Sequence, residues 1–519
     1  MMCAMCARIR RAALRRRTGA GDAPADITEP GNLRVGVMRG VAWKAATQVV
    51  LQAARAISTV LIARLLLPEE FGLAMMAIVV SSIALIFSDL ALGAALIQRK
   101  ELSQDDCSTV FWLSVGVGVV MTLIGIALAD PVAGFFGEPR VEPLFAVMSL
   151  TFVLSSLGIT HVTLLTRAMD FRSLELRLMV GGIAGAAVGV TLAVLDFGAW
   201  AIIAQHLTAA ALGSALAWRG LSWRPSRRFS MASLRSIAAF SANVFGSRLL
   251  FYVSRNADSL LIGRFLGPAA LGAYSIAYNI MLLPFSRIAG PLQEALFPAF
   301  ARLQDDPERM GNIWVRANRV VAAISLPAML GLTVVAPDFV RVVLGDKWEA
   351  AIPVIQVLAW VGFLQSLSRL NTSIQQARDR TDLMLRWSVL ITVSNLVAFA
   401  IGLEWGIVGV AVGYAISNTL LQPLNAWQTG RLIGVPLRRL AGAMAGVVQA
   451  TVLMLAVIVP LQLVLVEQGV PSGLRLLAVT LGGGAVYLGA CLWRAADVVE
   501  EVKLVRRRRS GADPAAPPG

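Results

Sequence analysis

The phrase LIARLLLPEEFG, from Leu61 to Gly72, returns as LIGRFLGPAALG, from Leu261 to Gly272. Leu, Ile, Arg, Leu, Pro and Gly are identical at an offset of 200 residues. At the same offset, Arg55 is matched by Arg255 and the motif 104–106 (QDD) by 304–306. Matches at one fixed offset across several elements indicate a duplicated unit. The chain is therefore predicted to contain two copies of one helical bundle.

The composition is that of a membrane protein. Of the 519 residues, 57% are hydrophobic and only 15% are charged, with a mean hydropathy of +0.71. Soluble domains carry about 25% charged residues. A helix needs about 20 apolar residues to cross the hydrocarbon core of a bilayer, and such segments recur along nearly the whole chain. We expect an all-α polytopic membrane protein with about 14 transmembrane helices.

The expected crossings, in chain order, are 40–66, 71–97, 107–129, 141–166, 174–195, 198–218, 236–266, 270–297, 313–336, 350–376, 383–403, 405–429, 440–466 and 473–493. The repeat offset spans six of these crossings, an even number. Two such copies have the same orientation, and a pseudo-two-fold axis along the membrane normal relates them. We expect two six-helix lobes followed by two accessory helices. The expected parts are a disordered basic tail (1–37), the first lobe (38–220), a basic linker (221–235), the second lobe (236–430), the accessory helices (431–495) and a second disordered basic tail (496–519).

The formal net charge of +15 follows the predicted topology. Lys and Arg gather in both tails and in every second loop, whereas the other loops hold few. By the positive-inside rule both termini are cytoplasmic, and an even number of crossings agrees with that. Because topology accounts for the basic residues, we expect no nucleic-acid partner. The first folded segment begins close to Met38, which is an alternative start to Met1.

Polar side chains form one stripe along the first predicted crossing. Its members are Lys44, Gln48, Gln52, Arg55 and Thr59. At about 100° per residue they fall within about 80° of arc. The seventh crossing carries Arg248, Tyr252 and Arg255 at the positions 200 residues later. Two-lobed transporters bind substrate where their repeats meet, so we predict that these residues line a central cationic cavity. Arg369 either extends this lining or approaches the cytoplasmic end of the tenth crossing.

An arginine in the middle of a bilayer costs about 2.5 to 3.5 kcal/mol, so it needs water, a counter-ion or a ligand. Two interpretations of Arg55 and Arg255 stay open. They form static ion pairs with Asp89 or Asp258 or snorkel, or they line a water-filled cavity that receives an anionic head group. We favour the cavity, and we regard Asp89 and Asp258 as candidate counter-ions or ion-coupling carboxylates.

Arg64 and Arg264 are a different case. Each lies at a predicted helix end beside a proline, and we expect both side chains to snorkel to the outer interface of the membrane.

The sequence lacks the motifs that are typical of several classes of protein. It contains neither the phosphate-binding GxxxxGK[ST] motif nor an HExxH zinc motif. Cys3 and Cys6 form a CxxC pair with no second pair to complete a zinc site. We expect no cofactor and no metal, no direct coupling to ATP and, as candidate energy sources, a proton or sodium gradient.

Longer phrases resemble one family of transporters. They are LIQRKELSQDDCSTVFW (96–112), SWRPSRRFS (222–230), SRNADSLLIGRFLGPAALGAYSIAYN (254–279), LFPAFARLQDD (296–306) and LGDKWEAAIPVIQVLA (344–359). In wording and order they are similar to the exopolysaccharide and lipopolysaccharide exporters. These proteins are the Wzx-like, colanic-acid-exporter branch of the multidrug/oligosaccharidyl-lipid/polysaccharide (MOP) flippase superfamily. The resemblance covers roughly residues 38–435.

The resemblance implies a V-shaped pair of six-helix bundles with two accessory helices. It also implies a flippase, not an enzyme, that moves an undecaprenyl-diphosphate-linked oligosaccharide repeat unit from the cytoplasmic to the periplasmic leaflet. Such a protein works by alternating access in the bacterial inner membrane, in exopolysaccharide or lipopolysaccharide biosynthesis. The implied partners are the lipid-linked oligosaccharide and the bilayer, with a polysaccharide polymerase and a chain-length regulator as further candidates. In similar flippases a cationic central cavity meets the pyrophosphate, which agrees with the predicted stripe, although the family's motifs do not themselves assign Arg55, Arg248 or Arg255.

Two other functions are alternatives to that of a flippase. A drug/cation antiporter of the same superfamily is the nearer one, but positive charge on both lobe-lining helices would repel a cationic drug. A membrane-embedded glycosyltransferase or polymerase is the second. Those enzymes need a catalytic acid or base and often a large external loop, and the longest external loop predicted here is short.

Overall fold

The computed structural model describes residues 30–89, 96, 102–231 and 255–494, and the regular structure within these ranges is entirely helical. Among these residues, 11 segments are long and apolar enough to cross a membrane. Several of these segments contain more than one helix, and the longest of them is Thr381–Leu432. The predicted all-α polytopic membrane class is therefore confirmed. The count of 14 crossings stays a prediction, because parts of the expected crossings 71–97 and 236–266 lie outside the described residues.

Most observed helices follow the expected crossings within a few residues. The first one, however, begins at Pro30, so residues 30–37 of the predicted disordered tail are helical, and the crossing expected at 141–166 is divided into two helices. Their bounds are α2 (Pro30–Leu65), α3 (Pro68–Asp89), α5 (Gln104–Ala127), α6 (Ala129–Phe136), α7 (Val141–Met148), α8 (Leu150–Arg167), α9 (Phe171–Val194), α10 (Trp200–Gly220), α12 (Pro268–Pro284), α13 (Gly290–Arg302), α14 (Pro307–Phe339), α15 (Ala351–Ala377), α16 (Thr381–Gly402), α17 (Gly406–Leu432), α18 (Leu437–Glu467) and α19 (Ser472–Arg494). Short segments η1 (Phe285–Ala289), η2 (Val340–Leu344), η3 (Asp346–Trp348) and η4 (Leu403–Trp405) connect some of them. Residues 255–266 are also helical and precede α12.

The matched motifs of the two halves begin corresponding helices. Pro68 and Pro268 are the first residues of α3 and α12, where the fixed φ of proline suits the first helical turn and its missing amide costs nothing. Asp106 and Asp306 lie at the start of α5 and α14. Asp106 forms a capping box with Ser103, whereas Asp306 Oδ1 accepts a hydrogen bond from the Arg309 amide at 3.0 Å. Both aspartates therefore satisfy amides that the first helical turn leaves without a partner.

The crossing expected near 270–297 is not one regular helix. It consists of α12, the π-helical segment η1 and α13. Pro284 ends α12 directly before η1, and a proline lacks the amide that would continue the helical ladder. Single π-helical turns inside helices occur often at functional sites. This break determines where the side chains of η1 lie.

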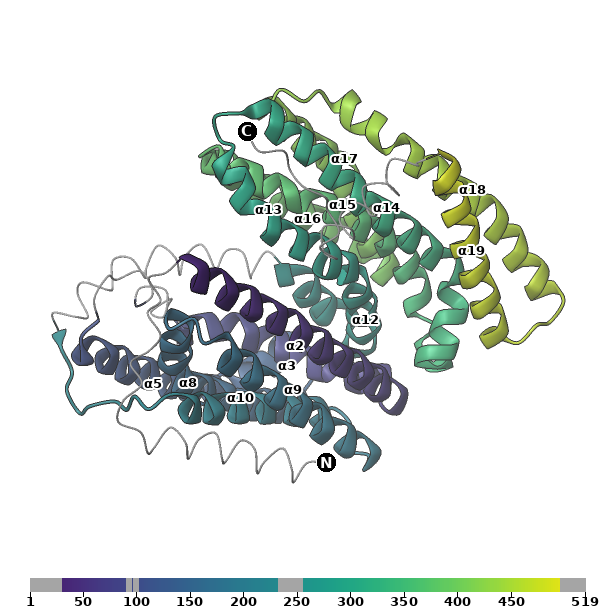
Figure 1. Ribbon diagram of the computed structural model, residues 1–519. Helices are drawn as coiled ribbons and strands as arrows, with labels where there is room; N and C mark the ends of the chain where they lie inside the picture. The colour runs from purple at the N-terminus through teal and green to yellow at the C-terminus, as the bar shows by residue number, and fades with distance from the viewer. Residues whose placement is uncertain (1–29, 90–95, 97–101, 232–254, 495–519) are drawn as a thin grey trace, which may run out of the picture.

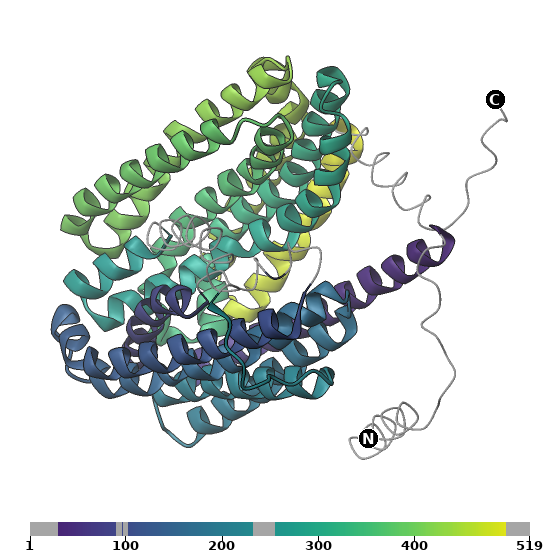
Figure 2. The same ribbon diagram turned by 90° about the vertical axis from the view of Figure 1, so that its left-hand side faces the viewer.

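The helices form two bundles (Figure 1). One contains α2, α3 and α5 to α10, and the other contains α12 to α17, with α18 and α19 packed against α14. Figure 2 shows the two bundles inclined to one another. Within the described part of the chain, the main contact between the bundles is made by α3 and α12.

The repeated phrase explains how α3 and α12 approach so closely. A Cβ atom added at Gly72 would overlap the carbonyl oxygen of Pro268, and one added at Gly272 would overlap the carbonyl oxygen of Pro68. The two copies of the phrase therefore pack against each other reciprocally, as a local two-fold axis requires. Only glycine lets the two backbones come this close.

We expect Gly72→Ala and Gly272→Ala each to destabilise the protein by about 1 to 3 kcal/mol, the usual cost of overpacking. The measurement is the Tm of the purified chain in detergent. Gly116→Ala is the matched control, because Gly116 is also helical and a Cβ there meets nothing within 4 Å. Equal Tm values for the three variants would contradict a backbone contact between the bundles.

A buried ion pair attaches the two accessory helices to the second bundle. Arg475 of α19 donates to Asp338 of α14 through Nη2, at 2.5 Å from Oδ1, and through Nε, at 3.2 Å from Oδ2. Gln462 Nε2 of α18 donates to the same carboxylate at 2.6 Å. The Asp338 side chain is fully buried. Three helices therefore depend on one carboxylate.

Arg475→Leu should lower the Tm, because it leaves the Asp338 carboxylate buried without its cation. We expect a loss of about 3 kcal/mol, at the lower end for buried pairs because Arg475 keeps some exposure. Arg475→Leu combined with Asp338→Leu should recover part of that stability, since both charges are then removed. Arg380→Leu breaks the exposed pair with Asp382 and is the control. A double variant as unstable as Arg475→Leu alone would contradict this account.

Candidate functional site

Part of the predicted polar stripe lies in a seam between α2 and α9. Gln48 Nε2 donates to Glu175 Oε2 at 3.1 Å, and Thr47 Oγ1 donates to the same oxygen at 3.3 Å. Glu175 is buried on α9. Glu175 is not predicted from the sequence, because one acidic residue near a predicted helix end forms no pattern. Gln52 is half-buried one turn farther along α2.

Arg55 lies farther along α2, where the two bundles approach each other. Its side chain is exposed and forms no ion pair with any residue that the structure describes. Its positive charge acts on Arg287, which belongs to η1 of the other bundle, and on His206 of α10. The Arg55 charge therefore lies near enough to Arg287, a residue of the other bundle, for the two charges to repel.

Two further arginines converge on Phe285, the first residue of η1. The Cζ atom of Arg369, on α15, lies 4.6 Å from the centroid of the Phe285 ring. The Cζ atom of Arg255, in the helical segment 255–266, lies 5.9 Å from the same centroid. Both distances are within the range at which a ring attracts a cation. The two arginines are half-buried and close enough for their charges to repel.

We call Arg55, Arg255, Arg287 and Arg369 the arginine cluster. Glu294 of α13 is the carboxylate whose charge acts on Arg369. The Nε atom of Arg369 is buried, and in the described part of the chain it has no hydrogen-bond partner. A buried donor without an acceptor costs free energy.

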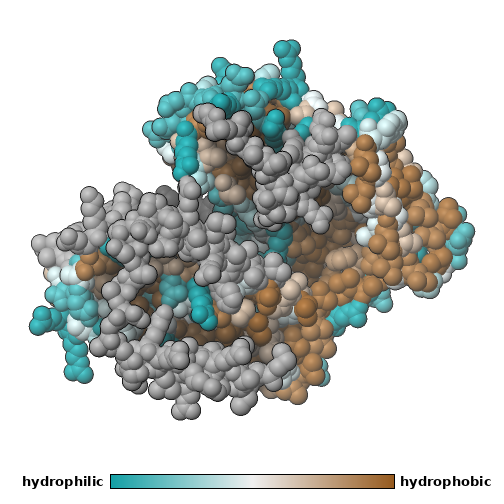
Figure 3. Space-filling model, in the orientation of Figure 1, coloured by the Kyte–Doolittle hydropathy of each residue, from teal (hydrophilic) through white to brown (hydrophobic). Residues whose placement is uncertain are grey.

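This arrangement suits one class of ligand. Guanidinium groups form bidentate, charge-assisted hydrogen bonds with phosphate oxygens. A phosphate or diphosphate would therefore supply the negative charge and the acceptors that these side chains need. The space-filling view shows a hollow between the bundles with hydrophilic side chains in it, whereas the face over α18 and α19 is hydrophobic (Figure 3).

Arg287 is not among the predicted site residues, because the predicted polar stripes lie on the first helix of each half. A signal was present, since Pro284 and Arg287 interrupt the same apolar crossing within four residues. A proline that breaks a transmembrane helix frees backbone groups and turns the following side chains. The π-helical turn that results here sends Phe285 and Arg287 to the arginine cluster.

Asp258 is buried among neutral hydrogen-bond donors. Its Oδ2 atom accepts from the Tyr274 hydroxyl at 3.0 Å, and its Oδ1 atom accepts from the Ser259 amide at 2.7 Å. Between Asp258 and Arg255, both of which the structure describes, no ion pair forms. The Arg255 charge nevertheless acts on the Asp258 carboxylate, so Asp258 is a nearby counter-charge that makes no direct contact with Arg255.

Four further residues belong to the predicted site. The side chains of Lys44, Asp89, Arg248 and Tyr252 lie outside the described residues.

Arg64 and Arg264 do more than snorkel, because each reaches across to the opposite bundle. Arg64 Nε donates to the Val343 carbonyl at 2.8 Å, and its Nη2 atom donates to the Val342 carbonyl. Arg264 Nη1 donates to the Gly134 carbonyl at 3.4 Å. Both arginines keep an exposed side chain. Each copy of the repeated phrase thus binds the backbone of the other half.

An aromatic side chain accompanies each of these contacts. Trp348 Nε1 donates to the Ala63 carbonyl at 2.7 Å, and the Trp348 ring lies edge-on to Phe71 with centroids 5.6 Å apart. In the other half Phe136 packs on Gly263, where an added Cβ would come within 2.8 Å of its ring. Ala63 and Gly263 correspond at the repeat offset. We call Arg64, Arg264 and these aromatic contacts the reciprocal clamp.

Comparison with known proteins agrees with this fold. A family model described as polysaccharide biosynthesis protein matches residues 61–353. The chain is 31% identical over 402 residues to the lipopolysaccharide biosynthesis protein WzxC of Escherichia coli K12, covering 75% of this chain and 80% of that protein. It is 26% identical to the succinoglycan biosynthesis transport protein ExoT of Rhizobium meliloti 1021, covering 92% of this chain and 97% of that protein.

Among solved structures, the lipid II flippase MurJ in an inward closed conformation has a similar fold. The TM-score is 0.68 at 13% sequence identity, and the match covers 87% of this chain and 100% of that one. The resemblance drawn from the sequence phrases is therefore confirmed: this multi-pass membrane protein belongs to the polysaccharide biosynthesis protein family.

Proposed function

We propose that the protein is a flippase for an undecaprenyl-diphosphate-linked oligosaccharide repeat unit in exopolysaccharide or lipopolysaccharide biosynthesis. The observation that carries the proposal is the arginine cluster, which combines charges from both bundles of a polytopic membrane protein. Membership of a family whose relatives are named for polysaccharide biosynthesis and transport supports the same function.

The diphosphate is the part of this substrate that the arginine cluster recognises. Hydrogen bonds to a charged group contribute about 1.5 to 3 kcal/mol each. Several arginines around one diphosphate therefore provide strong binding, and that binding must weaken on the far side of the membrane for release. A cationic drug would instead be repelled by the same charges, which argues against a drug/cation antiporter.

The distribution of Lys and Arg supports an orientation with both termini in the cytoplasm of a bacterium and the chain in its inner membrane. The parts of the chain keep their predicted roles in this proposal: two six-helix lobes at 38–220 and 236–430, accessory helices at 431–495 and basic cytoplasmic tails. The ends of the bundles that carry Pro68 and Pro268 then face the periplasm. A polysaccharide polymerase and a chain-length regulator are the proposed downstream partners.

In this orientation the reciprocal clamp is the periplasmic gate. Alternating access requires the lobes to separate at one end while they close at the other. The clamp holds the periplasmic end through side chain to carbonyl hydrogen bonds, which water can replace at low cost because Arg64 and Arg264 are exposed. Asp258 and Asp89 are candidate groups for coupling this movement to a proton or sodium gradient.

Removing charge from the arginine cluster should reduce transport. We expect Arg369→Ala to weaken binding of undecaprenyl diphosphate by about tenfold to a hundredfold, as the loss of a charge-assisted hydrogen bond predicts. Arg55→Ala combined with Arg255→Ala should abolish polysaccharide output in a deletion strain. The control is Arg431→Ala, because Arg431 also stacks on an aromatic ring, that of Trp427, but lies outside the cluster. Normal output from the double variant at equal protein levels would refute the proposed site.

Loosening the clamp should favour opening of the periplasmic end. Spin labels at positions 65 and 265, introduced into a cysteine-free chain, report the distance between the two phrases. We expect Arg64→Ala with Arg264→Ala to shift the distance distribution to longer values. Arg341→Ala is the control, because Arg341 pairs with Glu349 at the same end but within one bundle. An unchanged distribution in the double variant would show that the clamp does not hold the gate.

A further inference from the structure

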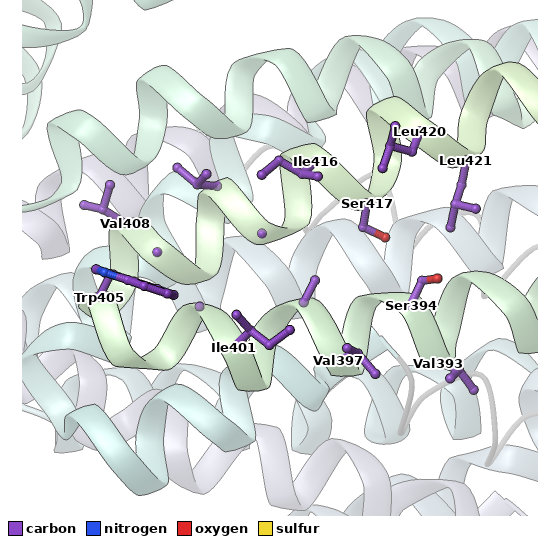
Figure 4. A pocket seen from close by; sticks show the side chains of 15 residues that line it. Val393, Ser394, Val397, Ile401, Trp405, Val408, Ile416, Ser417, Leu420 and Leu421 are labelled. Carbon is purple, nitrogen blue, oxygen red and sulfur yellow. The ribbon is translucent and has the colours of Figure 1, made fainter.

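A groove of about 650 Å³ runs along the surface between α16 and α17. In Figure 4 side chains of the two helices face one another across it, from Trp405 at one end to Val393 and Leu421 at the other. Its lining is apolar except for Ser394, Ser417 and the indole nitrogen of Trp405. The volume is in the range of small-molecule sites, about 300 to 1,000 Å³. We call this feature the α16–α17 groove.

Small residues in the seam between the helices produce the groove. A Cβ at Gly402 would lie 2.5 Å from the Gly409 carbonyl oxygen, and one at Gly413 would lie 2.6 Å from the Ala398 carbonyl oxygen. The two backbones are therefore in contact along the floor. Larger side chains such as Val397 and Ile416 stand on either side as walls. The hollow is built into the sequence of both helices.

The length of the groove selects among lipid chains. On α17 its lining extends from Val408 to Leu421, which is about 20 Å at a rise of 1.5 Å per residue. The hydrocarbon core is about 30 Å thick, so each leaflet provides about 15 Å. An acyl chain of a phospholipid ends near the midplane and would leave part of the groove empty. A chain that fills it must continue past the midplane, as a long polyprenyl chain can.

The groove lies on the face of α17 opposite to the one that contacts α15, the helix that carries Arg369. The face of α17 turned toward α15 is polar: Tyr414 accepts a hydrogen bond from Gln365 Nε2 at 2.5 Å, and Gln422 pairs with Ser368, the neighbour of Arg369. The groove-lining residues Val412 and Ile416 lie two positions from Tyr414, which is roughly the opposite side of a helix. One helix therefore separates the groove from the side chains around Arg369.

We propose that the α16–α17 groove holds the polyprenyl chain of the lipid whose diphosphate the arginine cluster binds. This inference rests on the proposed function and adds a binding site for the chain to the site for the head group. The chain would then leave the site past α17 and lie in a defined place on the protein, instead of dispersing in the bilayer. Chain length becomes part of substrate recognition.

The test compares two probes on the full-length purified protein. Undecaprenyl diphosphate carries the long chain, and geranyl diphosphate carries the same head group on a short chain. Val397→Trp and Ile416→Trp fill the groove from side chains that are 53% and 56% exposed. Leu390→Trp and Leu424→Trp are matched controls, since these residues lie on the same two helices, are 45% and 48% exposed and do not line the groove.

We expect the groove variants to weaken binding of undecaprenyl diphosphate about tenfold, or about 1.4 kcal/mol, and to leave geranyl diphosphate binding unchanged. The control variants should bind both probes as the parent does. Equal undecaprenyl diphosphate affinity in all four variants would overturn the proposal, as would an equal loss for both probes. Loss of co-purified phospholipid without a change in undecaprenyl diphosphate affinity would show an acyl-chain site and would overturn it as well.

A separate measurement tests the head-group site of the proposed function. Arg369→Ala should weaken both probes, because both carry the diphosphate. If it does not, the head-group site is refuted and this inference falls with it. If Arg369→Ala weakens both probes while the groove variants change neither, the head-group site stands and only the groove assignment fails.

Discussion

The close approach of α3 and α12 is the contact on which the rest of this structure depends. Two glycines, Gly72 and Gly272, let each helix pack on the first residue of the other. In this conformation, a contact made at one end by such small residues holds the bundles close together there. It leaves the bundles free to incline to one another away from that end, and the hollow with its hydrophilic side chains lies between them (Figure 3).

Positive charge in a membrane protein is the second constraint. Arginine is costly in a bilayer unless water, a counter-ion or a ligand compensates it, yet the arginine cluster gathers four such side chains. Among the described residues, the Glu294 carboxylate acts on Arg369 and the Asp258 carboxylate interacts with Arg255. The break at Pro284 makes this gathering possible, because the π-helical turn carries Phe285 and Arg287 toward the other arginines. The regular α-helical hydrogen bonding is interrupted at η1, beside the arginines that are proposed to bind the ligand.

Helix α17 combines two environments that the proposed substrate requires. Its polar face hydrogen-bonds with α15 beside Arg369, and its apolar face forms a wall of the α16–α17 groove. An amphiphilic lipid has the same division between a charged head and a hydrocarbon chain. The helix that lies between the two sites is therefore suited to hold both parts of one molecule in register.

The sequence by itself determined the class of the fold, the bounds of most crossings and the existence of a repeat. Those features are local, since each crossing needs its own stretch of apolar residues, and Pro68 or Pro268 begins a helix whatever lies beyond it. It also indicated Arg55, Arg255 and Arg369, because polar residues stand out in apolar helices. Only the tertiary structure decided that Arg287 joins them, that Gln48 binds Glu175 and that Arg64 reaches Val343. These contacts join residues from different helices; Arg64 and Val343, for example, are 279 positions apart. The helical period of a sequence predicts which face of its own helix a side chain occupies. It does not predict which other helix that face contacts.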